Sequence, residues 1–94
     1  MEAQVRNALQ SISTSEQRVS AAEASAKAAK EKLDSETRLF QTGESTNFFV
    51  LTRQNELSDS RRRVVLATLE LNKAVARLQL ALGKTLQSHS ITLK

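Results

Sequence analysis

The side chains that could carry chemistry in this chain are mostly basic and gather in its second half. They are Arg53, Arg61, Arg62, Arg63, Lys73 and Arg77, set against Glu56, Asp59 and Glu70. A basic helical arm can bind the phosphates of RNA or DNA. However, consecutive arginines point in different directions around a helix, and no aromatic residues alternate with them to stack on bases. A solvated or inter-helix charged face is the favoured interpretation, and no nucleic-acid partner is expected.

Metal binding and catalysis have little support in the residue types. His89 is the only histidine and cysteine is absent, so a transition-metal site built from this chain is not expected. Serine and threonine are plentiful, but the chain has no glycine-rich phosphate loop and no evident nucleophile–base pair. The sequence therefore predicts no catalytic residues, no metal, no cofactor and no enzymatic activity.

Two apolar series at seven-residue spacing, mirrored about Ser45, predict the fold. They consist of Ile12, Val19, Ala26, Leu33 and Phe40 before the centre, and of Val50, Leu57, Val64, Leu71 and Leu78 after it. Mirrored series bring facing residues into the same layers of an antiparallel pair, and a strict heptad makes the two helices supercoil gently. We therefore expect an all-α fold, a long antiparallel two-helix coiled-coil hairpin whose seam these residues form.

Glycine and cap residues set the expected boundaries. Gly43 can end the first helix in a left-handed conformation, and Gly83 can end the second in the same way. Ser45, Thr46 and Asn47 are all good N-cap residues for the second helix. The expected segments are helix one at residues 1–42, a hairpin tip at 43–47, helix two at 48–82 and a polar C-terminal tail at 83–94.

Some apolar residues have no place in the hairpin seam. A second line on helix two consists of Leu66, Leu69, Ala76 and Leu80. Two rods side by side bury less surface than a globule of equal length, so we expect the hairpin to be completed by self-association. Phe48 and Phe49 are adjacent and cannot both face the seam. The favoured interpretation is that both fill the tip, and the alternative is that one stays exposed as a docking anchor.

The residues around the tip resemble a known family. The resemblance is to the second periplasmic hairpin of TolC-type outer-membrane efflux channels, and it rests on Arg38, Phe40, Gly43, Val50, Leu51 and Gln54, with Ala81, Leu82 and Gly83 at the far end. Together with the mirrored heptads these matches span nearly the whole chain. Phe49 and Thr52 stand where many members place acidic residues, so an acidic constriction is not expected from this hairpin.

The resemblance implies a periplasmic part of an outer-membrane protein, namely one wall segment of a trimeric helical conduit. It implies that a periplasmic adaptor docks at the tip, on Thr42, Gly43, Glu44 and Ser45. It also implies that the chain is a fragment or an excised hairpin, whose contact with a membrane is made by other parts of the parent. No apolar run is long enough to span a bilayer, and the opening MEAQVRNALQ lacks the features of an export signal.

Two alternatives stay open at this point. The first is the coiled-coil hairpin of a periplasmic adaptor protein, which has the same build and also presents a polar tip. The Ala81-Leu82-Gly83 ending favours the channel, since adaptor hairpins are normally flanked on both sides by β domains. The second is a basic helical arm that binds RNA, which salt-dependent RNA binding would reveal.

Overall fold

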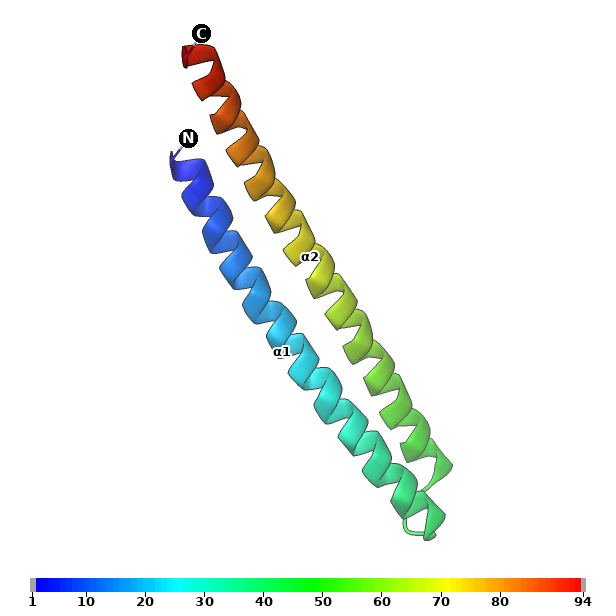
Figure 1. The fold of residues 1–94 in the computed structure, drawn as a ribbon. Helices are drawn as coiled ribbons and strands as arrows, with labels where there is room; N and C mark the ends of the chain where they lie inside the picture. Colours follow the sequence, from blue (N-terminus) through cyan, green and yellow to red (C-terminus); the bar gives the residue numbers. More distant parts are fainter. Residues whose placement is uncertain (1, 94) are drawn as a thin grey trace.

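The computed structural model describes residues 2–93 of the chain and the side chains of residues 3–83. Helix α1 spans Glu2–Gln41, helix α2 spans Asn47–Leu93, and a turn of residues 42–46 joins them. The two helices run antiparallel as one rod that measures 77 × 14 × 12 Å, with both chain ends at one end and the turn at the other (Figure 1). This is the helical hairpin that the mirrored heptads predict.

Both helices are uninterrupted because the chain favours helix nearly everywhere. It has no proline, and it is rich in Ala, Leu, Glu, Lys and Arg, which have high helix propensity. The serine- and threonine-rich stretch at residues 11–15 stays helical. Over the described residues, neither helix has an apolar stretch long enough to cross a membrane.

The far end of α2 differs from the expected one. The sequence predicts that helix two ends at residue 82, before a polar tail, whereas α2 in the structure continues to Leu93. A glycine C-cap needs a left-handed backbone, and among the described residues only Gly43 is a glycine with positive φ. Gly83 is therefore an interior helical glycine, which costs only about 1 kcal/mol relative to alanine. His89 lies outside the described side chains.

The two helices pack through two lines of residues each. The predicted seam is half-buried along most of its length, and Leu57 is the most enclosed of its side chains at 7% exposure. A second line, three positions further along each helix, is also buried or half-buried. It consists of Ala8, Ser15, Ala22, Ala29 and Glu36 on α1, and of Arg53, Ser60, Ala67, Ala74 and Ala81 on α2.

Phe40 departs from the expected seam. Its residue is 45% exposed, so it does not fill a buried layer. Phe40 lies in the last turn of α1, and its carbonyl oxygen accepts a hydrogen bond from the Gly43 N–H at 3.1 Å. Because the chain reverses here, nothing beyond the tip covers the ring.

Candidate functional site at the hairpin tip

The turn begins with a glycine that closes α1. Gly43 has a φ of +82°, and an added β-carbon there would lie in open space. The Gly43 N–H donates to the Phe40 carbonyl at 3.1 Å, and the Glu44 N–H donates to the Leu39 carbonyl at 2.8 Å. This pair of bonds is the Schellman motif, which satisfies the last carbonyl groups of a helix. The predicted role of Gly43 as a left-handed C-cap is confirmed.

The turn ends with a threonine that starts α2. The Thr46 hydroxyl oxygen accepts a hydrogen bond from the Phe49 N–H at 3.4 Å. The Val50 N–H donates to the Thr46 carbonyl at 3.2 Å, which is the first bond of the helical ladder. Thr46 is therefore the N-cap of α2, and of the three consecutive candidates Ser45, Thr46 and Asn47 it is the one that fills this position.

The four residues expected at the tip are not equivalent. Thr42, Gly43 and Glu44 are exposed at the apex of the hairpin. Ser45 is half-buried, and its hydroxyl donates to the Glu36 Oε2 atom at 2.6 Å. The apex therefore presents three of the four residues to the outside, while the Ser45 side chain is engaged with α1.

A polar network lies directly below the turn. The Glu36 side chain is only 13% exposed, and its Oε1 atom accepts a hydrogen bond from Arg53 Nε at 3.4 Å. Arg53 Nη1 donates to both carboxylate oxygens of Glu56, each at 3.1 Å. The hydrogen bond and charge of Glu56, followed by those of Glu36, raise the pKa of Arg53 above its ordinary value, against the opposing effect of burial. Arg53 therefore stays positively charged and bridges the two helices.

The sequence interpretation missed Glu36 and Arg53, although a signal was present. Both belong to the second mirrored line, in the layer nearest the tip. Every other layer of that line combines Ala or Ser from both helices. One oppositely charged pair in a mirrored series of small residues indicates an inter-helix ion pair.

Four exposed apolar residues next to the turn, which we call the apolar collar, are Leu39, Phe48, Phe49 and Leu51. Their exposure corrects the interpretation of the phenylalanines. Phe48 is 71% exposed and Phe49 is also exposed, so these rings do not fill the tip. Their centroids lie 5.7 Å apart with the planes at 72°, an edge-to-face contact. Leu39 and Leu51 are exposed at the same level of the hairpin. Exposed aromatic residues beside an exposed turn are typical of a protein-binding surface.

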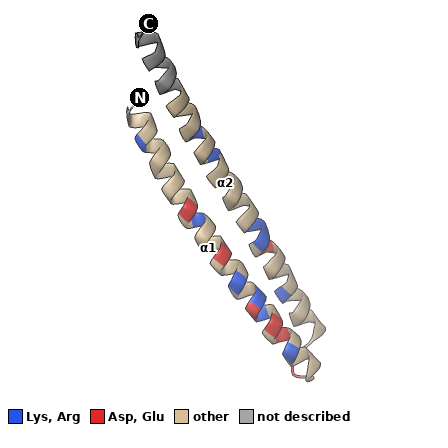
Figure 2. Ribbon diagram, in the orientation of Figure 1, with Lys and Arg blue, Asp and Glu red and all other residues tan. Residues whose placement is uncertain are grey.

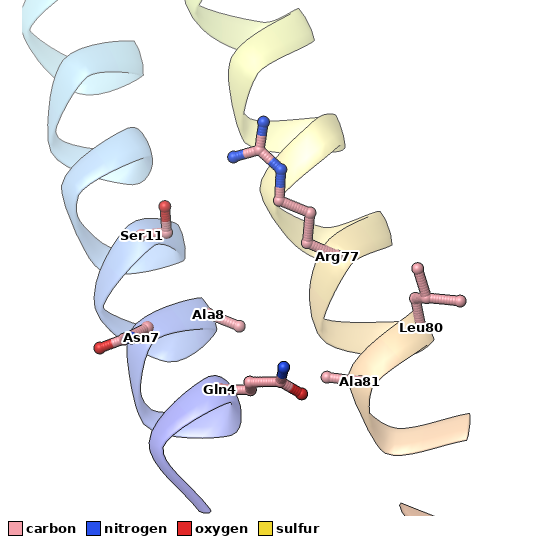
Figure 3. Close-up of a pocket in the computed structure, with 7 residues that line it drawn as sticks. All are labelled: Gln4, Asn7, Ala8, Ser11, Arg77, Leu80 and Ala81. Carbon is pink, nitrogen blue, oxygen red and sulfur yellow. The ribbon is translucent and has the colours of Figure 1, made fainter. Parts of the chain in front are cut away.

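The small residues of the second line leave hollows along one edge of the hairpin. At the open end a hollow of about 360 Å³ includes Ala8 and Ala81 in its wall, and Figure 3 shows the Gln4 side chain reaching across it from α1 towards Ala81. Further along, Ser15 and Ala74 line another hollow, of about 410 Å³. Facing residues of the mirrored line thus meet in shared hollows, as an antiparallel register requires.

The basic residues of α2 do not form one cluster. Arg61, Arg62 and Arg63 are all exposed, and Figure 2 shows basic and acidic residues interspersed along the hairpin. Arg63 shares a hollow with Glu56 and Asp59. Lys73 Nζ lies 3.8 Å from Glu70 Oε1. Among the described residues no group of His, Cys, Asp or Glu side chains is suited to hold a metal ion.

A comparison with protein families assigns the hairpin. The family model described as outer membrane efflux protein matches residues 2–84, which covers α1, the turn and most of α2. The chain belongs to the outer membrane efflux protein family. This is a family of transport proteins, and the hairpin is a segment of such a protein. No curated protein and no solved structure matches the chain.

Membership of the outer membrane efflux protein family favours the channel hairpin over the two open alternatives. The match includes the tip residues and both helices, the parts on which the resemblance to efflux channels rests. An adaptor hairpin and an RNA-binding arm have no comparable support. At the tip of this efflux-protein segment, Thr42, Gly43 and Glu44 are exposed beside the exposed Phe48 ring, and this surface is the candidate functional site.

Proposed function

We propose that this hairpin forms part of the periplasmic helical wall of an outer-membrane efflux channel and docks a periplasmic adaptor through its tip. In the complete channel the hairpin would stand beside copies of itself in a trimer, and Thr42, Gly43 and Glu44 would contact the adaptor. The rod shape suits a wall segment, since a helix rises 1.5 Å per residue and both helices extend along most of the 77 Å length.

The observation that carries the proposal is the form of the apex in a chain of this family. Gly43 is exposed, holds a positive φ and has open space where a side chain would start. Because glycine has no side chain, the tip of another hairpin can approach the backbone closely at this apex. The apolar collar behind it, with Phe48 most exposed, supplies area that a partner can bury.

The proposal is tested by substituting Gly43 in a full-length efflux channel that carries this hairpin. Gly43→Ala and Gly43→Trp impose the same backbone strain, because neither residue favours a positive φ. They differ in bulk, which Gly43→Trp adds at the apex. We expect export to be lost in Gly43→Trp and largely retained in Gly43→Ala, with both variants inserted in the outer membrane.

The measurement is efflux of a dye or drug from cells, with channel insertion followed by immunoblot of the outer-membrane fraction. Gly43→Ala is the matched control for backbone strain. Export that survives Gly43→Trp at normal channel levels would mean that Gly43 serves only the turn. Adaptor docking at this apex would then be wrong.

A further inference from the structure

The carboxylate of Glu36 has a role that packing between the helices does not explain. The other layers of the second line combine Ala and Ser from both helices and enclose no charge. A carboxylate at 13% exposure must be paired and hydrogen-bonded, since leaving water is costly for a charged group. Its two partners are Ser45 of the turn and Arg53 of α2. One carboxylate thus joins all three parts of the hairpin.

The hydrogen bond from the Ser45 hydroxyl to Glu36 holds the middle of the turn in place. On one side the Schellman bonds tie Gly43 and Glu44 to α1. On the other side Thr46 caps α2. Ser45 lies between them, and its 2.6 Å bond to Glu36 anchors it to a residue well inside the C-terminal part of α1. Hydrogen bonds to a charged acceptor are roughly twice as strong as neutral ones, so this bond is well suited to hold the turn.

Arg53 in turn holds the Glu36 carboxylate. Its Nη1 atom donates to both oxygens of Glu56, one turn along the same helix, at 3.1 Å. This contact orients the guanidinium group, because the group is planar and its donors have fixed directions. The Nε–H of Arg53 then donates to the Glu36 Oε1 atom of the other helix at 3.4 Å.

We propose that Glu36 is a positioning residue for the partner surface at the tip. It holds Ser45, is itself held by Arg53, and so fixes the turn with Thr42, Gly43 and Glu44 facing outward. This inference rests on the proposed function, and the partner is the tip of a periplasmic adaptor hairpin. A partner that meets a preformed apex avoids the entropy loss of ordering it, so the network raises affinity without touching the partner.

The first experiment measures the turn itself, in the 94-residue chain without any partner. Hydrogen exchange is followed at the Gly43 and Glu44 amides, which are both bonded to α1. Ser45→Ala removes the hydroxyl, Ser45→Thr keeps one, and Ser35→Ala is a control on an exposed serine of α1. We expect Ser45→Ala to speed exchange at both amides roughly fivefold or more, since one charged hydrogen bond is lost.

In the same experiment Ser45→Thr and Ser35→Ala should exchange at nearly the original rate. Circular dichroism of each variant reports whether the hairpin remains folded. Exchange at Gly43 and Glu44 that is the same in Ser45→Ala as in the original chain would overturn the inference. This result does not depend on adaptor binding.

The second experiment measures binding to the purified periplasmic adaptor of the same efflux system, by surface plasmon resonance. Ser45→Ala and Glu36→Gln should weaken binding roughly three- to tenfold, because the turn must then be ordered on docking. Ser45→Thr should restore most of the affinity, which a purely steric role of Ser45 would not give. Equal affinity of Ser45→Ala and the original chain contradicts positioning by Glu36. Failure of the original chain to bind the adaptor contradicts the proposed function instead.

Discussion

The chain contains two glycines, and their different backbone conformations predict opposite changes in stability when each is replaced by alanine. Gly43 adopts a φ of +82° in the turn, whereas Gly83 is helical and lacks a positive φ. A β-carbon at either position would meet nothing within 4 Å apart from the adjoining backbone, so packing does not distinguish them. Backbone conformation alone determines the result of adding a side chain.

Alanine at these two positions should therefore change stability in opposite directions. Gly43→Ala should lower the free energy of unfolding by about 1 kcal/mol, because the left-handed region is unfavourable for a residue with a β-carbon. Gly83→Ala should raise it by about 0.5 to 1 kcal/mol, because alanine is the better helix former. Urea unfolding monitored by circular dichroism measures both. If both variants change stability in the same direction, one of the two assigned conformations is wrong.

At the level of the elements, the large seam residues should carry most of the stability. Leu57 is the most enclosed of the large apolar side chains, while Arg62 is exposed on the same helix. Leu57→Ala should cost about 2 kcal/mol, near the low end for buried leucines, since a two-helix seam is open at its edges. Arg62→Ala should change stability by less than about 0.5 kcal/mol. Thermal melts that rank the two variants in the reverse order would show that the seam is misplaced.

The elements also show what the sequence can predict and what it cannot. The two helices and the turn follow from large apolar residues at heptad spacing and from Gly43, because both signals are local. The second packing line is missed because Ala and Ser give no hydrophobic signal, although Ala74 is among the least exposed residues. The continuation through Gly83 is missed because a glycine's backbone conformation depends on the chain that follows it.

The candidate site can be predicted only in part, because some of its contacts depend on residues that are distant in the sequence. The exposure of Thr42, Gly43 and Glu44 follows from their place in a turn. The inward bond of Ser45 does not, because it needs the position of Glu36, nine residues earlier, relative to the turn. The exposure of Phe48 and Phe49 also contradicts the expectation that both rings fill the tip.

At the level of the whole molecule, the hairpin leaves a large apolar surface uncovered. Val65, Leu66, Leu69 and Leu80 are each at least half exposed on α2. Burying such surface is favourable by about 25 cal/mol per Å². The isolated hairpin should therefore self-associate, in keeping with its proposed place beside other copies in a channel wall.

Sedimentation equilibrium at micromolar concentrations tests this association. The double substitution Leu66→Glu with Leu69→Glu should shift the chain towards monomer, because it places charge on the apolar surface. Gln54→Glu with Thr68→Glu is the matched control, with the same change of net charge at exposed polar positions of α2. An original chain that stays monomeric and folded at high micromolar concentration would contradict the prediction.

The antiparallel layers of this hairpin can also form between two copies of the chain. Any layer that α1 forms with α2 of its own chain can equally be formed with α2 of another chain. Two chains opened at the turn could exchange helices and rebuild every layer, including the pair of Glu36 with Arg53, in a domain-swapped dimer. The turn of residues 42–46 is the part that differs between the two forms. The left-handed conformation of Gly43 thus favours a hairpin closed within one chain over an exchanged pair, and it does so without altering any contact along the rod.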